Sequence, residues 1–202
     1  MSFDRIGVLG AGAWGTALAY STQAAGRDVL IWSRETEVAE ALSSGQGNPL
    51  FLPNVDLPAI PATSNLADFA NVDAILAVVP AQFARSVFEQ LNGLIPDDTP
   101  FALCAKGVEH GSLKLMADVL HETRPSAPVA VLSGPSFAID VAKGLPTAVT
   151  LACEDQALGA LWMESIGRPE FRPYWSNDIV GAEIGGAVKN VLAIACGAVE
   201  GL

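Results

Sequence analysis

The feature that most constrains this chain is a run of closely spaced glycines, Gly10–Gly15 (GAGAWG), which fits the pattern G-x-G-x-x-G. The run directly follows a short apolar segment, Ile6–Leu9, and leads into Trp14–Ala25, a helix-like segment that Gly26 would terminate. In this setting the first glycine permits a tight turn, the second lets a ligand approach the backbone, and the third lets helix and strand pack closely. The free N–H groups at the start of the helix suit a pyrophosphate, and a glycine-rich turn without a ligand is the less favoured alternative.

Apolar runs that we expect to be strands alternate with helix-like segments along the rest of the chain. The expected strands are 29–32, 74–79, 101–105, 129–132, 148–152 and 171–175, and the expected helices are 36–42, 83–91, 113–123, 137–143 and 156–166. The segment 48–61, with four prolines, breaks the alternation, and we expect it to be extended. Strands alternating with helices are typical of an α/β fold, here a doubly wound, mostly parallel Rossmann-like sheet with helices on both faces.

The last segment, 182–202, is almost wholly apolar or small, and we expect it to form a helix. A helix that is apolar on all sides is normally buried, yet no further elements follow that would cover this one. We therefore divide the chain into a dinucleotide-binding domain, 1–181, and the first helix of a truncated second domain, 182–202. A helix that packs on the sheet, or on a second copy of the chain in a homodimer, is the alternative.

The formal net charge of -11 argues against a nucleic-acid partner, because neutralising phosphates needs clustered lysines and arginines. It is compatible with an anionic cofactor, which backbone N–H groups and a few cations can bind. The chain has no uninterrupted apolar run as long as a bilayer requires, so we expect no membrane insertion. Cys104, Cys153 and Cys196 lie in apolar stretches without metal-ligand spacing, so we expect buried reduced thiols, no metal site and a cytoplasmic location.

The residues after the second strand bear on the choice of cofactor. An NAD site usually has an acidic residue there, which binds the ribose hydroxyls. This chain has Ser33 and Arg34 instead, and a hydroxyl and a guanidinium can hold the 2′-phosphate of NADP. We therefore expect NADP, while Glu35 leaves NAD possible if the strand ends one residue later. The alternative for Arg34 is a solvated residue at the start of a helix.

Polar residues also follow two later strands. In a doubly wound sheet, ligands gather at the carboxyl ends of the strands, where Lys106 and the segment Ser133–Ser136 are expected to lie. An ordinary loop lysine is an equal alternative for Lys106. For Ser136 the alternative is a helix cap, a role that is compatible with ligand binding.

Lys189 is the most informative polar residue, because it lies in the apolar segment Ile184–Leu192. A buried ammonium is costly unless paired, and burial lowers its pKa, so such a lysine can exchange a proton near neutral pH. Asn190 is placed to orient a neighbour, and Gly185 and Gly186 would let another backbone or a ligand come close. The alternative is a lysine that extends along the helix to the surface.

Six short blocks of the sequence are more specific together than any one of them alone. They are Gly10–Ala19 (GAGAWGTALA), Trp32–Arg34 (WSR), Leu52–Pro53, Ala105–Gly107 (AKG), Leu132–Ala138 (LSGPSFA) and Gly185–Asn190 (GGAVKN). In this order they resemble the bacterial-type NAD(P)-dependent glycerol-3-phosphate dehydrogenases, and the resemblance spans nearly the whole chain. The first block is shared with many dehydrogenases, whereas the last two are much more specific.

The resemblance implies a two-domain enzyme that uses NAD(P)H to reduce dihydroxyacetone phosphate to sn-glycerol 3-phosphate, a phospholipid precursor. It implies that Lys189 is the general acid/base and that Lys106 contacts both cofactor and substrate. The cofactor-binding residues predicted from pattern and resemblance together are Gly10, Gly12, Ala13, Trp14, Gly15, Arg34, Lys106 and Ala138. The residues implied to bind the small phosphorylated substrate are Lys106, Gly134, Ser136, Lys189 and Asn190.

Three departures from the family pattern qualify these implications. Ala13 stands where the family often has serine, which removes one hydroxyl contact to the cofactor, and Ala81 replaces another serine. The helical substrate domain, of which 182–202 would be the first helix, is otherwise absent, so we expect the isolated chain to be nearly inactive. The competing interpretations are a related 3-hydroxyacid, 6-phosphogluconate or ketopantoate-type dehydrogenase, and a free-standing NADP-binding module.

Overall fold

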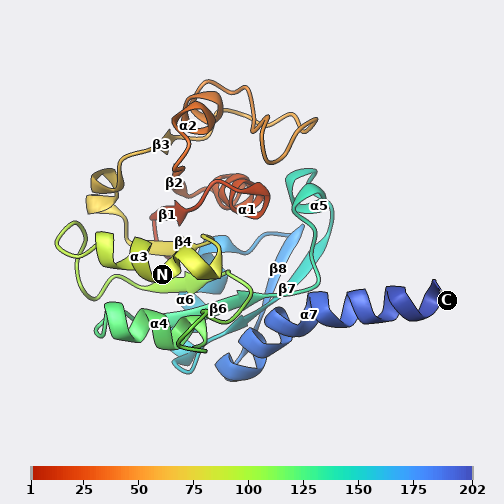
Figure 1. Cartoon of the computed structure of the whole chain (residues 1–202). Coiled ribbons are helices and arrows are strands. Elements are labelled where there is room, and N and C mark those ends of the chain that lie inside the picture. The colour runs from red at the N-terminus through yellow and green to blue at the C-terminus, as the bar shows by residue number, and fades with distance from the viewer. Residues whose placement is uncertain (1, 202) are drawn as a thin grey trace.

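The computed structural model describes residues 2–201, apart from the side chain of Asn190. Within them, eight strands form one sheet in the order β3-β2-β1-β4-β5-β6-β7-β8. The strands are Arg5–Leu9 (β1), Asp28–Trp32 (β2), Ala62–Thr63 (β3), Ala74–Ala77 (β4), Phe101–Leu103 (β5), Val129–Ser133 (β6), Thr147–Ala152 (β7) and Phe171–Ser176 (β8). All neighbours pair in parallel except β6 and β7, which are antiparallel. The predicted mostly parallel, Rossmann-like α/β fold is confirmed (Figure 1).

Helices cover both faces of the sheet, and each face has its own apolar core. The helices of one face are α1 (Ala13–Ala24), α2 (Thr36–Ser43), α5 (Ala138–Ala142) and α6 (Gln156–Ile166). The elements of the other face are the 3-10 helix η1 (Leu66–Asn71), α3 (Ala81–Gln90), α4 (Met116–Thr123) and the start of α7 (Ile179–Glu200). Figure 1 shows α1 beside α5, and α3 beside α4.

The two cores explain why the central strands read as continuous apolar runs. Successive side chains of a strand point to opposite faces of the sheet. In β4, Ile75 therefore packs in the core of α3 and α4, while its neighbour Leu76 packs in the core of α1 and α6. Both side chains are fully buried, so a polar residue at either position would lose its contacts with water.

The observed elements agree with the predicted order, and the differences lie at the carboxyl ends of strands and in the shortest elements. The strands predicted over 74–79 and 101–105 end at Ala77 and Leu103, and the two residues after each become loops at the edge of the sheet. The sequence pattern does not predict β3 or η1, because a two-residue strand and a short 3-10 helix carry no hydrophobic periodicity.

The C-terminal helix differs most from expectation. It begins at Ile179, three residues before the predicted start, and its first turns pack on the core of α3 and α4. Along the rest of its described length no described element covers its apolar side, as expected from the sequence, and Val191, Ile194 and Val199 are exposed. The expectation of three buried thiols is wrong for the same reason, because Cys196 lies on this helix and is exposed, whereas Cys104 and Cys153 are buried.

Helix α7 also has the length and the composition of a membrane-spanning segment, with a mean hydropathy of 1.5 over its most apolar window. Length and composition alone are weak evidence, because a helix from the core of a soluble protein meets the same criteria.

Candidate functional site

The glycine run forms the turn between β1 and α1. Gly10 has a φ of +112°, a backbone conformation that residues with a Cβ rarely adopt, and its N–H donates to the carbonyl of Trp32 at 3.0 Å. Gly12 is the N-cap of α1, and it provides no side-chain acceptor for the N–H groups of the first turn. These N–H groups, together with the positive end of the helix dipole, are therefore available to an anionic ligand.

Gly15 is closely surrounded by other atoms, whereas Gly12 borders open space. A Cβ added to Gly15 would lie 1.8 Å from the carbonyl oxygen of Gly10, so only glycine lets α1 pack this closely on the turn. A Cβ added to Gly12 would meet no atom within 4 Å. The backbone at Gly12 thus borders open space.

A cavity of about 480 Å³ lies beside this turn. Gly12, Trp32 and Arg34 line it on one side, and Val79 and Pro80, which follow β4, line it on another. The cavity therefore joins the glycine turn to the carboxyl ends of β2 and β4, where a doubly wound sheet binds its ligand.

Arg34 and Glu35 form an ion pair at the end of this cavity. The Nε and Nη2 atoms of Arg34 donate to Oε1 of Glu35 at 3.1 and 2.9 Å, and the hydroxyl of Ser33 donates to Oε2 at 3.4 Å. Burial acts to raise the pKa of Glu35, but the hydrogen bonds from Arg34, its own backbone and Ser33 outweigh burial, and the pKa is lowered. Strand β2 ends at Trp32, yet Glu35 still lines the cavity, so an acidic and a basic residue both border it.

A second cavity, of about 300 Å³, shares Val79 and Pro80 with the first. Its lining brings together four of the predicted site residues, Trp14, Lys106, Ser136 and Ala138. Helix α5 begins at Ala138 with Phe137 as its N-cap and no side-chain capping bond, so the alternative of Ser136 as a helix cap is wrong.

Lys106 lines this second cavity, and Lys189 lies against Phe137, which also lines it. Lys106 follows β5, and its Nζ donates to the carbonyl of Gly134 at 3.3 Å. The Nζ of Lys189, on α7, lies 5.5 Å from the centroid of the Phe137 ring. Burial lowers the pKa of Lys106, and the charge of the adjacent Lys189 ammonium lowers it further.

The structure corrects the prediction for Lys189. This side chain is only half-buried, and the Lys106 side chain beside it is exposed. The sequence predicts that Gly185 and Gly186 let another backbone or a ligand come close, but the described residues bring no backbone there. An added Cβ at Gly186 would meet side chains, 3.1 Å from Oγ of Ser133 and 3.5 Å from Cγ of Lys106, and one at Gly185 would meet no atom within 4 Å. The side chain of Asn190, predicted to bind substrate, lies outside the described part of the chain.

Side chains of α3 hold the loop that follows Lys106. Nε2 of Gln82 donates to the carbonyl of Val108, and Oε1 of Gln82 accepts the N–H of His110, both at 2.8 Å. Arg85 donates two bonds of 2.9 Å to the carboxylate of Glu109, and mainly for this reason the pKa of Glu109 falls to about 2. Sequence reasoning missed these residues because the partners lie 24 to 28 positions apart and share no local pattern.

Glu183 joins α7 to α4. Its side chain is buried, and Oε1 accepts the N–H of Ala117 in the first turn of α4 at 3.0 Å. Oε2 is buried without a hydrogen-bond partner among the described residues, and burial raises the pKa of this carboxyl. The sequence analysis does not single out Glu183, although a charged residue within a largely apolar helix is the same kind of signal as Lys189.

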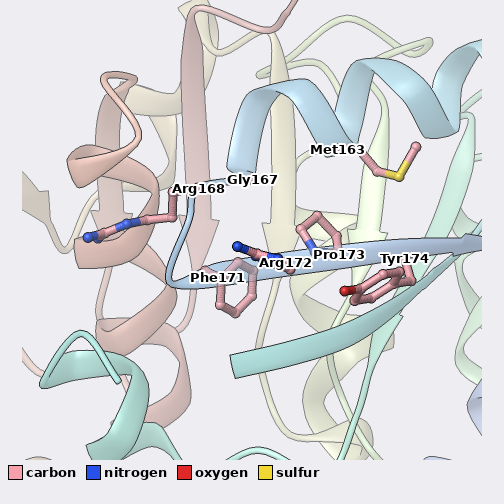
Figure 2. A pocket seen from close by; sticks show the side chains of 7 residues that line it. All are labelled: Met163, Gly167, Arg168, Phe171, Arg172, Pro173 and Tyr174. Carbon is pink, nitrogen blue, oxygen red and sulfur yellow. The ribbon is translucent and has the colours of Figure 1, made fainter. Parts of the chain in front are cut away.

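Another hollow, of about 390 Å³, lies between the end of α6 and β8, the strand at the edge of the sheet (Figure 2). Figure 2 shows Arg168, Arg172 and Tyr174 among its lining residues. None of the predicted site residues lines this hollow, and Arg168 is paired with Glu170 at 2.9 Å. No group of three or more His, Cys, Asp or Glu side chains within residues 2–201 is arranged to hold a metal ion.

Comparisons with known proteins cover nearly the whole chain. A family model described as "NAD-dependent glycerol-3-phosphate dehydrogenase N-terminus" matches residues 5–159, and the corresponding C-terminus model matches residues 178–202. Proteins named glycerol-3-phosphate dehydrogenase [NAD(P)+] from Caulobacter vibrioides and Maricaulis maris are each 56% identical, over 202 and 200 residues. The matches cover 100% and 98% of this chain but only 61% and 60% of those proteins.

The fold agrees with the same group of proteins. The crystal structure of a glycerol-3-phosphate dehydrogenase from Coxiella burnetii matches with a TM-score of 0.88 at 37% identity. The match covers 96% of this chain and 60% of that protein. The chain thus spans about 60% of the length of the curated relatives it matches.

Proposed function

The chain belongs to the NAD-dependent glycerol-3-phosphate dehydrogenase family, and from this premise we propose that residues 1–181 bind NAD(P)H. We further propose that the whole protein reduces dihydroxyacetone phosphate to sn-glycerol 3-phosphate. The observation that carries the proposal is the glycine turn, open at Gly12 and leading into a cavity that continues to Lys106. This arrangement fits a dinucleotide, whose pyrophosphate would meet the N-terminus of α1 while its two ends extend along the sheet edge.

The cofactor would be held largely by backbone groups, which suits a chain with a net charge of -11. We assign the pyrophosphate to the turn made by Gly10, Gly12, Ala13, Trp14 and Gly15. Arg34 would bind the 2′-phosphate of NADP, and Glu35 the ribose hydroxyls of NAD, so both cofactors are compatible with the site. Lys106 and Ala138 would contact the nicotinamide half from the second cavity. When bound, the cofactor supplies the hydride.

Lys106 and Lys189 would stabilise and neutralise the negative charge that develops on the carbonyl oxygen of the substrate. Reduction of a carbonyl places negative charge on its oxygen, which needs a proton donor and a nearby cation. We assign the proton donor to Lys189, which passes one proton from Nζ to the carbonyl oxygen, and a substrate contact to Lys106. The substrate is a small phosphorylated ketone, and its binding site would be lined by Gly134, Ser136 and Asn190.

We propose that α7 is the first helix of a helical substrate domain, with the domain boundary near residue 182. The match of 178–202 to the C-terminal family model supports this proposal, and an apolar helix that packs within such a domain needs no membrane. Lys189 would then lie between the two domains, and the 202-residue chain alone would be nearly inactive. We also propose that the whole protein is a cytoplasmic enzyme and forms a homodimer.

Calorimetric titration of the chain with NADPH, and with NADH in parallel, tests the cofactor assignment. We expect both to bind, NADPH more tightly, and Arg34→Ala to weaken NADPH while leaving NADH nearly unchanged. If neither nucleotide binds, the glycine turn is structural and the proposal for this domain fails. Assays of the whole protein with dihydroxyacetone phosphate, ketopantoate and 6-phosphogluconate would separate this family from the related dehydrogenases.

A further inference from the structure

The side chain of Asn48 is buried against the glycine turn, although it belongs to the proline-rich segment 48–61. It is only 1% exposed. Nδ2 donates to the carbonyl of Ala11 at 2.8 Å and to Oγ1 of Thr16 at 2.7 Å. Oδ1 accepts the N–H of Phe51 at 3.0 Å. The amide of Asn48 therefore has a partner for both its oxygen and its nitrogen, across 37 residues of sequence.

The bond to Ala11 has a consequence for the neighbouring peptide group. The carbonyl of Ala11 and the N–H of Gly12 belong to one planar trans peptide, so they point in opposite directions. Because Asn48 holds the carbonyl toward the buried side, the N–H of Gly12 is held toward the open space found at Gly12. That space is where the proposed pyrophosphate would lie.

Two further bonds fix the orientation of the Asn48 amide. The N–H of Phe51 can bond only to the amide oxygen, which leaves Nδ2 facing Ala11 and Thr16. The hydroxyl of Thr16 in turn donates to the same Ala11 carbonyl at 3.3 Å. Aspartate would place a carboxylate oxygen against the Ala11 carbonyl oxygen, and leucine would leave the Ala11 carbonyl and the Phe51 N–H without these partners in a buried site.

We propose that Asn48 is a positioning residue for the cofactor: through the Ala11 carbonyl it holds the Gly12 N–H toward the pyrophosphate. The inference rests on the proposed binding of NAD(P)H by this turn. A role confined to folding would affect all ligands of the cavity alike, whereas this role affects ligands that contain the pyrophosphate.

The test compares two ligands of the 202-residue chain, NADPH and adenosine 2′-monophosphate, which shares the Arg34 end but lacks the pyrophosphate. We expect Asn48→Ala to weaken NADPH on the order of tenfold, by loss of a preorganised charge-assisted hydrogen bond, and to leave adenosine 2′-monophosphate unchanged. The amide resonance of Gly12, followed by NMR without any ligand, should shift in this variant. The matched control is Ser43→Ala, which removes bonds to Ala62 but touches no residue of the glycine turn.

If Asn48→Ala does not fold, Thr16→Val decides, because it removes one Asn48 contact with little change of volume. We expect it to weaken NADPH by roughly threefold, with no effect on adenosine 2′-monophosphate. Unchanged NADPH affinity in a folded variant, or an equal loss for both ligands, overturns the inference. A wild-type chain that binds no NADPH overturns the proposed function instead, and this outcome is visible before any variant is made.

Discussion

Replacing Gly12 by alanine should separate binding from folding. Gly12 has φ and ψ of -64° and 178°, which alanine adopts without strain, and the added Cβ meets no atom within 4 Å. Alanine restricts the unfolded chain, which stabilises by about 0.4–1 kcal/mol, but it is a poorer N-cap than glycine by a similar amount. The two effects oppose each other, so the free energy of unfolding should change by less than about 1 kcal/mol.

The same methyl group would occupy the space into which the pyrophosphate must come. Losing one hydrogen bond to a charged group costs about 1.5–3 kcal/mol, which corresponds to a roughly ten- to hundredfold weaker Kd for NADPH. Calorimetric titration gives the Kd, and thermal unfolding of the same sample gives the stability. A folded Gly12→Ala variant that binds NADPH like the wild type would refute the assignment of the turn to the pyrophosphate.

Gly15→Ala is the matched control, since it makes the same chemical change three residues away. Its Cβ would lie 1.8 Å from the carbonyl oxygen of Gly10, a backbone atom that cannot move without deforming the turn. We expect a loss of about 3 kcal/mol or more, and a Tm lower by roughly 6–12 °C for a chain of this size. A Gly15→Ala variant as stable as Gly12→Ala would contradict the close packing of α1 on the turn that we infer at Gly15.

Three further predictions concern other parts of the site. Glu35→Gln removes a negative charge that pairs with Arg34 and would face the 2′-phosphate of NADPH. The ratio of NADPH to NADH affinity, measured by parallel titrations, should therefore rise by up to roughly fivefold. An unchanged ratio would count against Glu35 facing the ribose. Burial raises the pKa of Glu183 in the folded state, so the folded protein keeps this proton to a higher pH than the unfolded chain does. The free energy of unfolding therefore falls as the pH rises from the ordinary glutamate pKa through the raised pKa of the folded state. Glu183→Gln lacks this loss, and its stability relative to the wild type should increase between pH 4 and pH 8 in denaturant melts; a constant difference would show that burial does not perturb Glu183. The exposed apolar side of α7 should make the isolated chain associate with rising concentration in sedimentation experiments, and Val191→Lys should weaken this; a monomer at all concentrations contradicts it.

The order of the longer helices and strands and the position of the glycine turn follow from the amino-acid sequence alone. Both are local properties: a buried strand needs a short apolar run, and a turn such as that at Gly10 needs a residue without a Cβ. The alternation of strands and helices also predicts where each strand ends, and it therefore places Lys106 and Ser136 at one edge of the sheet. The structure brings both to the same cavity.

Which polar residues come into contact depends on the tertiary structure. Asn48 meets Ala11 across 37 residues, and Glu183 meets Ala117 across 66, and neither pair leaves a periodic signal in the sequence. Burial likewise depends on what packs against a residue and not on the composition of its own segment. For this reason the apolar context of Lys189 predicted a buried lysine wrongly: its side chain on α7 is half-buried.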